Sequence, residues 1–211
     1  MSKILEFKNV TVTSGKETIF DSLNISFEER NVYTLTGANG CGKSLFLKLA
    51  AGLAVPSSGE VLFCGMPLSK KTKSHVSYLP DSDFLSDFRT VKNIFSFYCD
   101  FFADFDSEKA LDYLGKAKIS LNDKIKELSD GTLRKLCSVL TLSRKAKLFI
   151  LDNPTKTTDA ATRNFILELI SSRNPDSAVL ITSTNLADIE NITTATLKIS
   201  NGKVSFKEES K

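Results

Sequence analysis

This sequence of 211 residues has little histidine, no cysteines at the spacing of a metal-binding motif and no long apolar runs. It contains one histidine, His75, and four cysteines, none of which pair at the spacing of a metal-binding motif. A zinc site is therefore not expected. Buried, reduced thiols are the better interpretation of Cys41, Cys64, Cys99 and Cys137.

Apolar stretches long enough for a membrane are also missing. No run approaches the roughly 18 consecutive apolar residues of a membrane-spanning helix, and the N-terminal MSKILEFKNV lacks the apolar core of a signal peptide. We therefore expect a soluble, cytoplasmic protein. Any peripheral place at the inner face of the cell membrane has to come through a partner.

Charge of one sign is scarce as well, since 28 Lys and Arg side chains against 25 Asp and Glu leave a net charge of +3. So small an excess, spread over scattered residues, gives no reason to expect nucleic acid as a partner. Hydrophobic residues make up 41% of the chain and charged residues 25%, which is ordinary for a folded protein. The length allows one well-buried domain with a smaller inserted lobe.

Strand-like and helical patterns follow one another along the chain. Residues 3–36 hold several strand patterns with turn signals at SGKE and at Asp21–Ser22, and the Asn201–Gly202 pair predicts a closing hairpin. Thr90 suits the N-cap of a helix. Further strands are expected at 60–65, 76–80, 147–152 and 178–183, and helices at 44–55, 91–102, 107–118, from about 129, and at 160–172. The alternation predicts an α/β fold with a parallel sheet.

The segment GANGCGKS, Gly37–Ser44, matches the phosphate-binding pattern G-x-x-x-x-G-K-S/T. Its glycines let backbone N–H groups turn toward phosphate oxygens, and the helix that follows presents its positive end to the same anion. Lys43 can reach the outer phosphates, and the Ser44 hydroxyl suits Mg²⁺. A strand pattern precedes the loop and a helical one follows it, which favours a nucleotide site over an unliganded glycine-rich turn.

The segment KLFILD delivers Asp152 at the end of an apolar strand. A carboxylate in that place can hold magnesium, directly or through water. The alternative is a carboxylate that caps the next helix, which the upstream phosphate loop makes less attractive.

These segments occur in the order GANGCGKS, YLPDSDF, ELSDGTLRKL, LFILDNPT and LITSTNL, and that order resembles the nucleotide-binding domain of ABC transporters over nearly the whole chain. ELSDGT is the discriminating piece, because it is similar to the family's signature, usually LSGGQ. The chain resembles in particular the short ATPase subunits of ABC-2-type exporters.

The resemblance implies a P-loop ATPase core of α/β type, with an N-terminal antiparallel β subdomain and an inserted helical subdomain. The whole chain, 1–211, would be one domain. Its core with the β subdomain would occupy 1–81 and 135–211, and the helical subdomain with the signature would occupy 82–134.

The resemblance also implies a site shared by two such subunits, with ATP and Mg²⁺ as cofactors. Ser44 and Asp152 would hold the metal, and Lys43 and Asp152 would serve catalysis. Ser129 and Gly131 would touch the nucleotide bound by the second subunit, and Asp159 matches the family's D-loop aspartate. The residues expected to cradle the triphosphate are Gly37, Ala38, Asn39, Gly40, Cys41, Gly42, Lys43, Ser44 and Leu45.

Several positions depart from the family's pattern. Asn153 stands where the family has a catalytic glutamate, Thr184 where it has the switch histidine, and Asp81 where it has the Q-loop glutamine. The signature carries Asp130 and Thr132 in place of glycine and glutamine, and Ser14 replaces the aromatic residue that stacks on adenine.

The change at Asn153 matters most, because a carboxamide cannot accept a proton from an attacking water. Losing a positioned general base costs ~10²- to 10⁴-fold in rate. Thr184 removes an imidazole from the same step, while Lys43, Ser44 and Asp152 remain. We therefore expect ATP binding to outlast hydrolysis.

The leading functional hypothesis is the ATP-binding subunit of an ABC transporter, in the export direction, with weak or partner-dependent hydrolysis. Its expected partners are a second ABC ATPase subunit, identical or different, and an integral membrane transporter subunit. The alternative is a catalytically inactive ATP-sensing regulatory module without a transport role. A translation or DNA-repair factor fits poorly at this length. A small GTPase fits poorly as well, because the chain has no N-K-x-D segment for guanine recognition.

Overall fold

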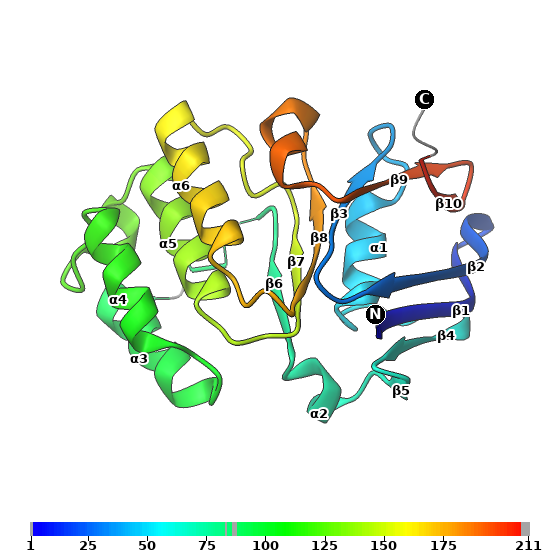
Figure 1. Cartoon of the computed structure of the whole chain (residues 1–211), viewed down its shortest axis with the longest axis horizontal. Coiled ribbons are helices and arrows are strands. Elements are labelled where there is room, and N and C mark those ends of the chain that lie inside the picture. Colours follow the sequence, from blue (N-terminus) through cyan, green and yellow to red (C-terminus); the bar gives the residue numbers. More distant parts are fainter. Residues whose placement is uncertain (1, 83, 86–87, 208–211) are drawn as a thin grey trace.

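The structure is a computed structural model that describes residues 2–82, 84–85 and 88–207 (Figure 1). Its strands form an antiparallel sheet in the order β2-β1-β4-β5 and a second sheet in the order β10-β9-β3-β8-β7-β6. The strands of the first sheet are β1 (Lys3–Ser14), β2 (Glu17–Glu28), β4 (Ser58–Phe63) and β5 (Met66–Pro67). Those of the second are β3 (Val32–Thr36), β6 (Val76–Leu79), β7 (Leu148–Leu151), β8 (Ala178–Thr182), β9 (Ala195–Ser200) and β10 (Lys203–Phe206).

The second sheet is parallel from β6 through β7, β8 and β3 to β9, and only β10 pairs antiparallel. Its central strands are continuous apolar runs: β7 reads LFIL and β8 reads AVLIT, and every residue of both is buried. Such runs suit strands that are covered on both faces.

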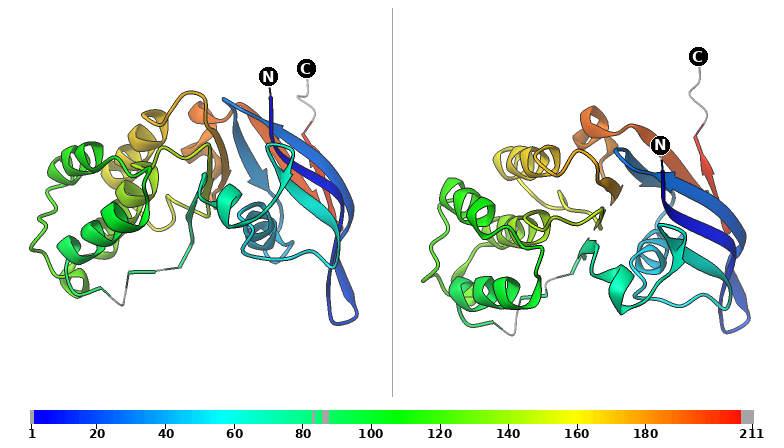
Figure 2. Two further views of the ribbon diagram at one scale, coloured as in Figure 1. Left: turned by 90° about the horizontal axis from the view of Figure 1, so that it is seen from below. Right: turned by 60° about the horizontal axis from the view of Figure 1, so that its bottom comes forward.

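Helices cover the second sheet on both sides (Figure 2). In Figure 1, α1 lies between this sheet and the antiparallel strands, while α3 to α6 gather on the other side. The α-helices are α1 (Lys43–Ala50), α2 (Lys70–Lys73), α3 (Val91–Phe101), α4 (Ser107–Lys116), α5 (Asp130–Leu142) and α6 (Ala160–Ser171). Short 3-10 helices span Ile125–Glu127, Leu186–Asp188 and Glu190–Ile192.

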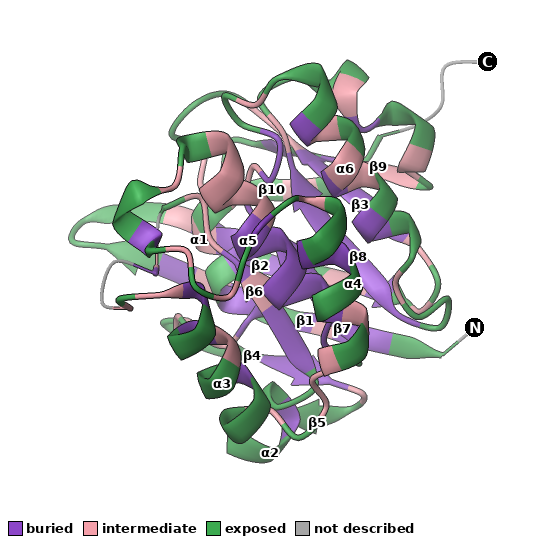
Figure 3. Cartoon of the chain, turned by 90° about the vertical axis from the view of Figure 1, so that its left-hand side faces the viewer, coloured by how far each residue is buried: buried purple, intermediate pink, exposed green. Residues whose placement is uncertain are grey.

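Neighbouring residues of one strand enter two separate hydrophobic clusters. Phe149 of β7 and Ile181 of β8 pack in the cluster made with α3 to α6. Ile150 and Leu180 pack in the cluster made with α1 and the antiparallel sheet. Alternation along the strand therefore places one core on each face of the sheet, and Figure 3 shows the buried strands behind helices whose outer faces are exposed.

The α/β class, the parallel sheet and the antiparallel N-terminal strands are confirmed. Thr90 caps α3, as expected, and its hydroxyl accepts a hydrogen bond from the Asn93 N–H. The closing hairpin is β9–β10, in which Asn201 (φ 50°) and Gly202 (φ 71°) both take the left-handed conformation that a two-residue turn of this kind requires.

Two expected boundaries are wrong. The turn signal at Asp21–Ser22 does not end a strand, because β2 runs through it with a positive φ at Ser22 (48°) and a register shift against β1. The helix expected at 44–55 ends at Ala50, well before Pro56, because Gly52 adopts φ +67°. A glycine in this conformation closes a helix, and the N–H groups of the next two residues bond the Lys48 carbonyl.

Within the described part of the chain, no helix combines the length and apolar character that crossing a membrane requires.

Truncating Phe46, on α1, should destabilise the protein strongly. Its fully buried ring stacks on Phe7 at 4.6 Å between ring centroids and meets Phe20 and Phe27 edge-on. We expect Phe46→Ala to lower the free energy of unfolding by about 3–5 kcal/mol in urea titrations. Phe101→Ala is the matched control, because that ring is 67% exposed, and should cost about 1 kcal/mol or less. Equal losses in the two variants would contradict this assignment of the core.

Candidate functional site

The loop GANGCGKS connects the carboxyl end of β3 to the first turn of α1, and packing requires two of its three glycines. A Cβ atom at Gly37 would lie 2.6 Å from the Cys41 Sγ and 2.8 Å from the Ile199 carbonyl oxygen. A Cβ atom at Gly42, which has φ +99°, would lie 2.9 Å from the ring of Phe20. The hydrophobic core therefore holds the loop close against the sheet and leaves room only for glycine at both positions.

The amino end of α1 is the one α-helix start in the described chain without a side-chain cap. Gly42 occupies its N-cap position in the left-handed conformation, and the first turn carries no acidic residue. The other α-helices, α2 to α6, are each capped by a Ser, Thr or Asp oxygen. Uncapped N–H groups and the helix dipole make this end of α1 suitable for an anion.

Lys43 and Ser44 are the first residues of α1. The Lys43 ammonium donates hydrogen bonds to the carbonyl oxygens of Gly37 (2.8 Å) and Ala38 (2.9 Å), so its positive charge lies over the loop. Ser44 is exposed beside it. The loop thus combines a cation, a hydroxyl group and helix N–H groups in one place.

Asp152 lies at the carboxyl end of β7, at the same edge of the sheet as the end of β3, because β3, β8 and β7 are parallel. Its side chain is 2% exposed, and its Oδ1 accepts a hydrogen bond of 2.7 Å from the Thr182 hydroxyl. The carboxylate is therefore fixed by its neighbours. Ligands bind preferentially at this edge of open parallel sheets.

Asn153 follows in a left-handed conformation with φ 49°, which asparagine tolerates better than most residues. Its backbone N–H donates to the Thr182 hydroxyl at 2.9 Å, and its Nδ2 lies 3.4 Å from the Asp152 Oδ1. Its Oδ1 is buried and has no hydrogen-bond partner within the described residues. The side chain at this position is thus a carboxamide directed into the site without a proton-accepting carboxylate.

Two other positions that depart from the family's pattern lie near the same edge. Thr184 is exposed in the loop after β8. The Asp81 carboxylate, after β6, accepts a hydrogen bond of 2.7 Å from the Lys156 ammonium and lies 3.8 Å from an Arg134 Nη2. Asp81 is thereby paired with basic groups.

A tyrosine on β6 lies close to these carboxylates. Burial, with the nearby charges of Asp152 and Asp81, raises the pKa of Tyr78 to about 12, so its phenol group stays neutral at physiological pH.

The expected signature residues lie on the opposite side of the sheet from α1. Ser129 caps α5 by accepting a hydrogen bond from the Thr132 N–H, and Ser129 and Asp130 are exposed. Gly131 follows in the first turn, where a Cβ atom would make only an ordinary contact. Figure 1 shows α5, which begins just after Ser129, and α1, which follows the phosphate loop, on different sides of the second sheet.

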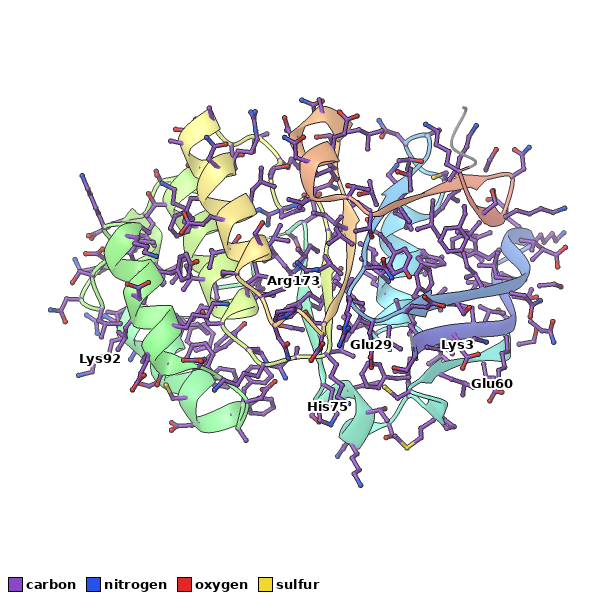
Figure 4. All side chains as sticks on the ribbon, viewed as in Figure 1. Lys3, Glu29, Glu60, His75, Lys92 and Arg173 are labelled. Carbon is purple, nitrogen blue, oxygen red and sulfur yellow. The ribbon has the colours of Figure 1, made fainter. Side chains whose placement is uncertain are left out.

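Three other residues have simpler local roles. Asp159 caps α6 by accepting a hydrogen bond of 2.7 Å from the Thr162 N–H, and this bond lowers the pKa of the Asp159 carboxyl group. Ser14 ends β1 at an exposed hairpin. His75 stacks on Phe63 just before β6, at the end of the sheet opposite Asp152 (Figure 4), and so lies outside the site.

Arg134 is a residue that the sequence did not single out. It lies on α5, its side chain is 13% exposed, and its guanidinium donates to backbone carbonyl groups at the ends of β6 and β7. An arginine between apolar residues in TLRKLC, on a helix with a buried face, is the signal that could have found it. A cavity of about 250 Å³ beside it is lined by Asp81, Asp130, Leu133, Arg134, Cys137, Lys156, Thr157 and Thr158.

The phosphate loop, the uncapped helix and the carboxylate at one sheet edge define a P-loop nucleotide-binding domain. The model of the family described as ABC transporter matches residues 20–156. The chain therefore belongs to the ABC transporter family, and the resemblance inferred from the sequence is confirmed.

Relatives with assigned names agree with this. The chain is 29% identical over 191 residues to the ABC transporter ATP-binding protein YtrB of Bacillus subtilis, and the aligned region covers 89% of this chain and 65% of that protein. It is 27% identical to the Nod factor export ATP-binding protein I of Cupriavidus metallidurans, covering 91% and 66%. With the lantibiotic transport ATP-binding protein SrtF of Streptococcus pyogenes it shares 28% identity, covering 98% and 91%. The chain thus spans about two thirds of the length of the first two relatives.

Solved structures confirm the fold. The chain matches an ATP-binding subunit of an ABC transporter with a TM-score of 0.87 at 20% identity, over 97% of this chain and 89% of that one. It matches a putative ABC transporter ATP-binding protein from Pyrococcus furiosus with a TM-score of 0.74 at 25% identity, over 87% and 92%.

The hydroxyl of Thr182 should be essential to the local structure around Asp152. Thr182→Val keeps the shape but leaves the buried Asp152 carboxylate with only the long 3.4 Å contact to the Asn153 Nδ2, and it leaves the Asn153 N–H without an acceptor. We expect the free energy of unfolding to fall by about 2 kcal/mol in urea titrations. Thr182→Ser keeps the hydroxyl, removes one methyl group and should cost about 1 kcal/mol. A larger loss in the serine variant would show that packing, not hydrogen bonding, matters here.

Proposed function

We propose that the chain is the ATP-binding subunit of an ABC transporter, which binds Mg-ATP and couples that binding to an integral membrane subunit. The observation that carries the proposal is the uncapped amino end of α1, with Lys43 beside it, at the same sheet edge as the buried carboxylate of Asp152. A polyphosphate supplies the negative charge that this arrangement lacks, and a divalent cation supplies the positive charge that Asp152 accepts.

In this proposal, the loop Gly37–Leu45 binds the triphosphate with its backbone N–H groups and the Lys43 ammonium. Ser44 and Asp152 hold magnesium, and their oxygen donors are the type that Mg²⁺ prefers. Bound magnesium neutralises phosphate charge and orients the phosphoryl group. The Thr182 hydroxyl keeps the Asp152 carboxylate oriented toward the site.

The part of the proposal that concerns a dimer rests on the helices α3 to α6. Ser129 and Gly131 lie at the amino end of α5, on the other side of the sheet from α1, and Ser129 is exposed there. We therefore assign them to the nucleotide bound by a second ABC ATPase subunit, with segment 82–134 as the helical subdomain that presents them. The remaining residues, 1–81 and 135–211, form the nucleotide-binding core of the single domain 1–211.

Export is the direction that we assign, because the relative from Cupriavidus metallidurans is named as a Nod factor export protein. A subunit of this type would lie peripherally at the inner face of the membrane, attached through its membrane partner.

The first test asks whether the protein binds Mg-ATP without hydrolysing it efficiently. Asn153 cannot act as a proton acceptor and Thr184 offers no imidazole, so purified protein should bind Mg-ATP while turning over well below about 1 s⁻¹. Lys43→Ala removes a charge-assisted contact to phosphate and should weaken binding by about tenfold or more. Calorimetric titration and phosphate release measure the two quantities. Absence of binding, or turnover of 1 s⁻¹ or faster, contradicts the proposal.

Restoring a carboxylate at position 153 should raise turnover. Asn153→Glu supplies a general base and should accelerate phosphate release by up to about 10²-fold, although Thr184 still limits the gain. Asn153→Gln is the matched control, because it imposes the same side-chain length and the same strain at φ 49° without a base. A similar rate in both variants would contradict the role of Asn153.

The second candidate is an ATP-sensing regulatory module without a transport role, which the paired losses at Asn153 and Thr184 favour. Fractionation of cells that produce the tagged protein separates the two. A transporter subunit should sediment with membranes and co-purify with an integral membrane protein, and detergent should release it as a complex. A pool found only in the cytosol, with or without ATP, would favour the regulatory module.

A further inference from the structure

Arg134 connects three elements of the proposed site through one side chain. Its Nη1 donates to the Pro80 carbonyl at 3.0 Å, just after β6. Its Nη2 donates to the carbonyl oxygens of Asn153 at 2.6 Å and Asp152 at 3.3 Å, and its Nε donates to the Pro154 carbonyl at 3.1 Å. The side chain itself belongs to α5, five residues after Ser129.

These contacts satisfy carbonyl groups for which the sheet provides no partner. The chain leaves β7 at Asp152 and immediately adopts a left-handed conformation at Asn153, so the strand ladder does not continue past this point. A guanidinium with several donors in a fixed plane can bond several such oxygens together. A lysine ammonium at the same position reaches fewer of them.

A charge network surrounds the same guanidinium. Asp81 lies 3.8 Å from the Arg134 Nη2 and is paired with Lys156 at 2.7 Å, which joins the segment after β6 to the segment after β7. The Arg134 side chain is largely buried, and burial lowers its pKa. A buried charge of this kind is retained at a cost in desolvation, which its contacts offset only when it is fully hydrogen-bonded.

We propose that Arg134 is a positioning residue for the metal–nucleotide site: it fixes the backbone on which Asp152 and Asn153 are carried and joins it to α5. This inference rests on the proposed function, since it assigns Asp152 to the magnesium of Mg-ATP. Arg134 itself contacts backbone carbonyl groups and not the ligand. Its loss should therefore affect nucleotide binding through magnesium, because the phosphate loop before α1 packs closely against Phe20 and Ile199, whereas the hydrogen bonds of Arg134 go to the segments after β6 and β7.

The test compares Arg134→Lys with a matched arginine variant. Arg144, just after the end of α5, is also buried and donates to the Val76 carbonyl at 2.8 Å, to the Ser74 carbonyl and to Asp104. It joins α5 to the beginning of β6, at the sheet edge away from Asp152. Arg144→Lys should thus cost comparable stability without touching the site.

Affinity for ATP is measured by calorimetry with magnesium and with EDTA for the full-length wild type and both variants. For Arg134→Lys we expect magnesium-dependent affinity to fall about tenfold or more, with affinity in EDTA within about twofold of the wild type. Arg144→Lys should keep the wild-type ratio of ATP affinity with magnesium to ATP affinity in EDTA. Without nucleotide, hydrogen exchange of the amides of Asp152, Asn153, Thr155 and Lys156 should accelerate in Arg134→Lys only.

The outcomes separate the two levels of the proposal. A wild-type magnesium ratio and unchanged exchange in Arg134→Lys overturn the inference and leave the proposed function intact, as does an equal loss in Arg144→Lys. A wild-type chain that binds neither Mg-ATP nor ATP contradicts the proposed function and the inference with it. If Arg134→Lys fails to fold, Arg134→Gln, which keeps two donors, takes its place in the same measurements.

Discussion

Parallel hydrogen bonding between β3, β8, β7 and β6 is the constraint on which the rest of the structure depends. It places the carboxyl ends of all four strands at one edge of the sheet, where the chain turns into the phosphate loop and into the segment after Asp152. The strands can be continuous apolar runs only because hydrophobic clusters cover both faces. The site thus exists where strands from distant parts of the sequence end together.

The same edge concentrates polar groups that the sheet leaves unpaired, and each is satisfied from a different element. Thr182, at the end of β8, serves both the Asp152 carboxylate and the Asn153 N–H. Arg134, from α5, serves the carbonyl groups that follow β7. Buried polar groups cost free energy unless they are paired, so these contacts fix the local backbone closely. Precision of this kind suits metal binding, which tolerates little displacement of its ligands.

Local chemistry explains which features the sequence could predict. The pattern GANGCGKS can be recognised from the type and spacing of its residues alone, and Asn201–Gly202 needs nothing beyond its own backbone preference. The expectations failed for two different reasons, long-range strand pairing in one place and a local backbone conformation in the other. Asp21–Ser22 has turn-forming residues, yet β2 continues because β1 pairs with it on both sides of the irregularity. Gly52 ended α1 earlier than the apolar pattern indicated, because a positive φ outweighs helical spacing.

The sequence by itself determined the residue types of the proposed site: the glycine-rich loop, Asp152 as a carboxylate after an apolar strand, and an amide and a hydroxyl at Asn153 and Thr184, where the proposal would otherwise call for an acid and an imidazole. These are properties of side chains and of their immediate neighbours. Only the tertiary structure decided that Lys156 pairs with Asp81 and that Arg134 bonds the segments after β6 and β7. Both depend on residues that are distant in sequence. Parallel pairing of β6 with β7 brings Asp81 and Lys156 together, and the packing of α5 against the sheet brings Arg134 to its carbonyl groups, and no local pattern encodes either contact.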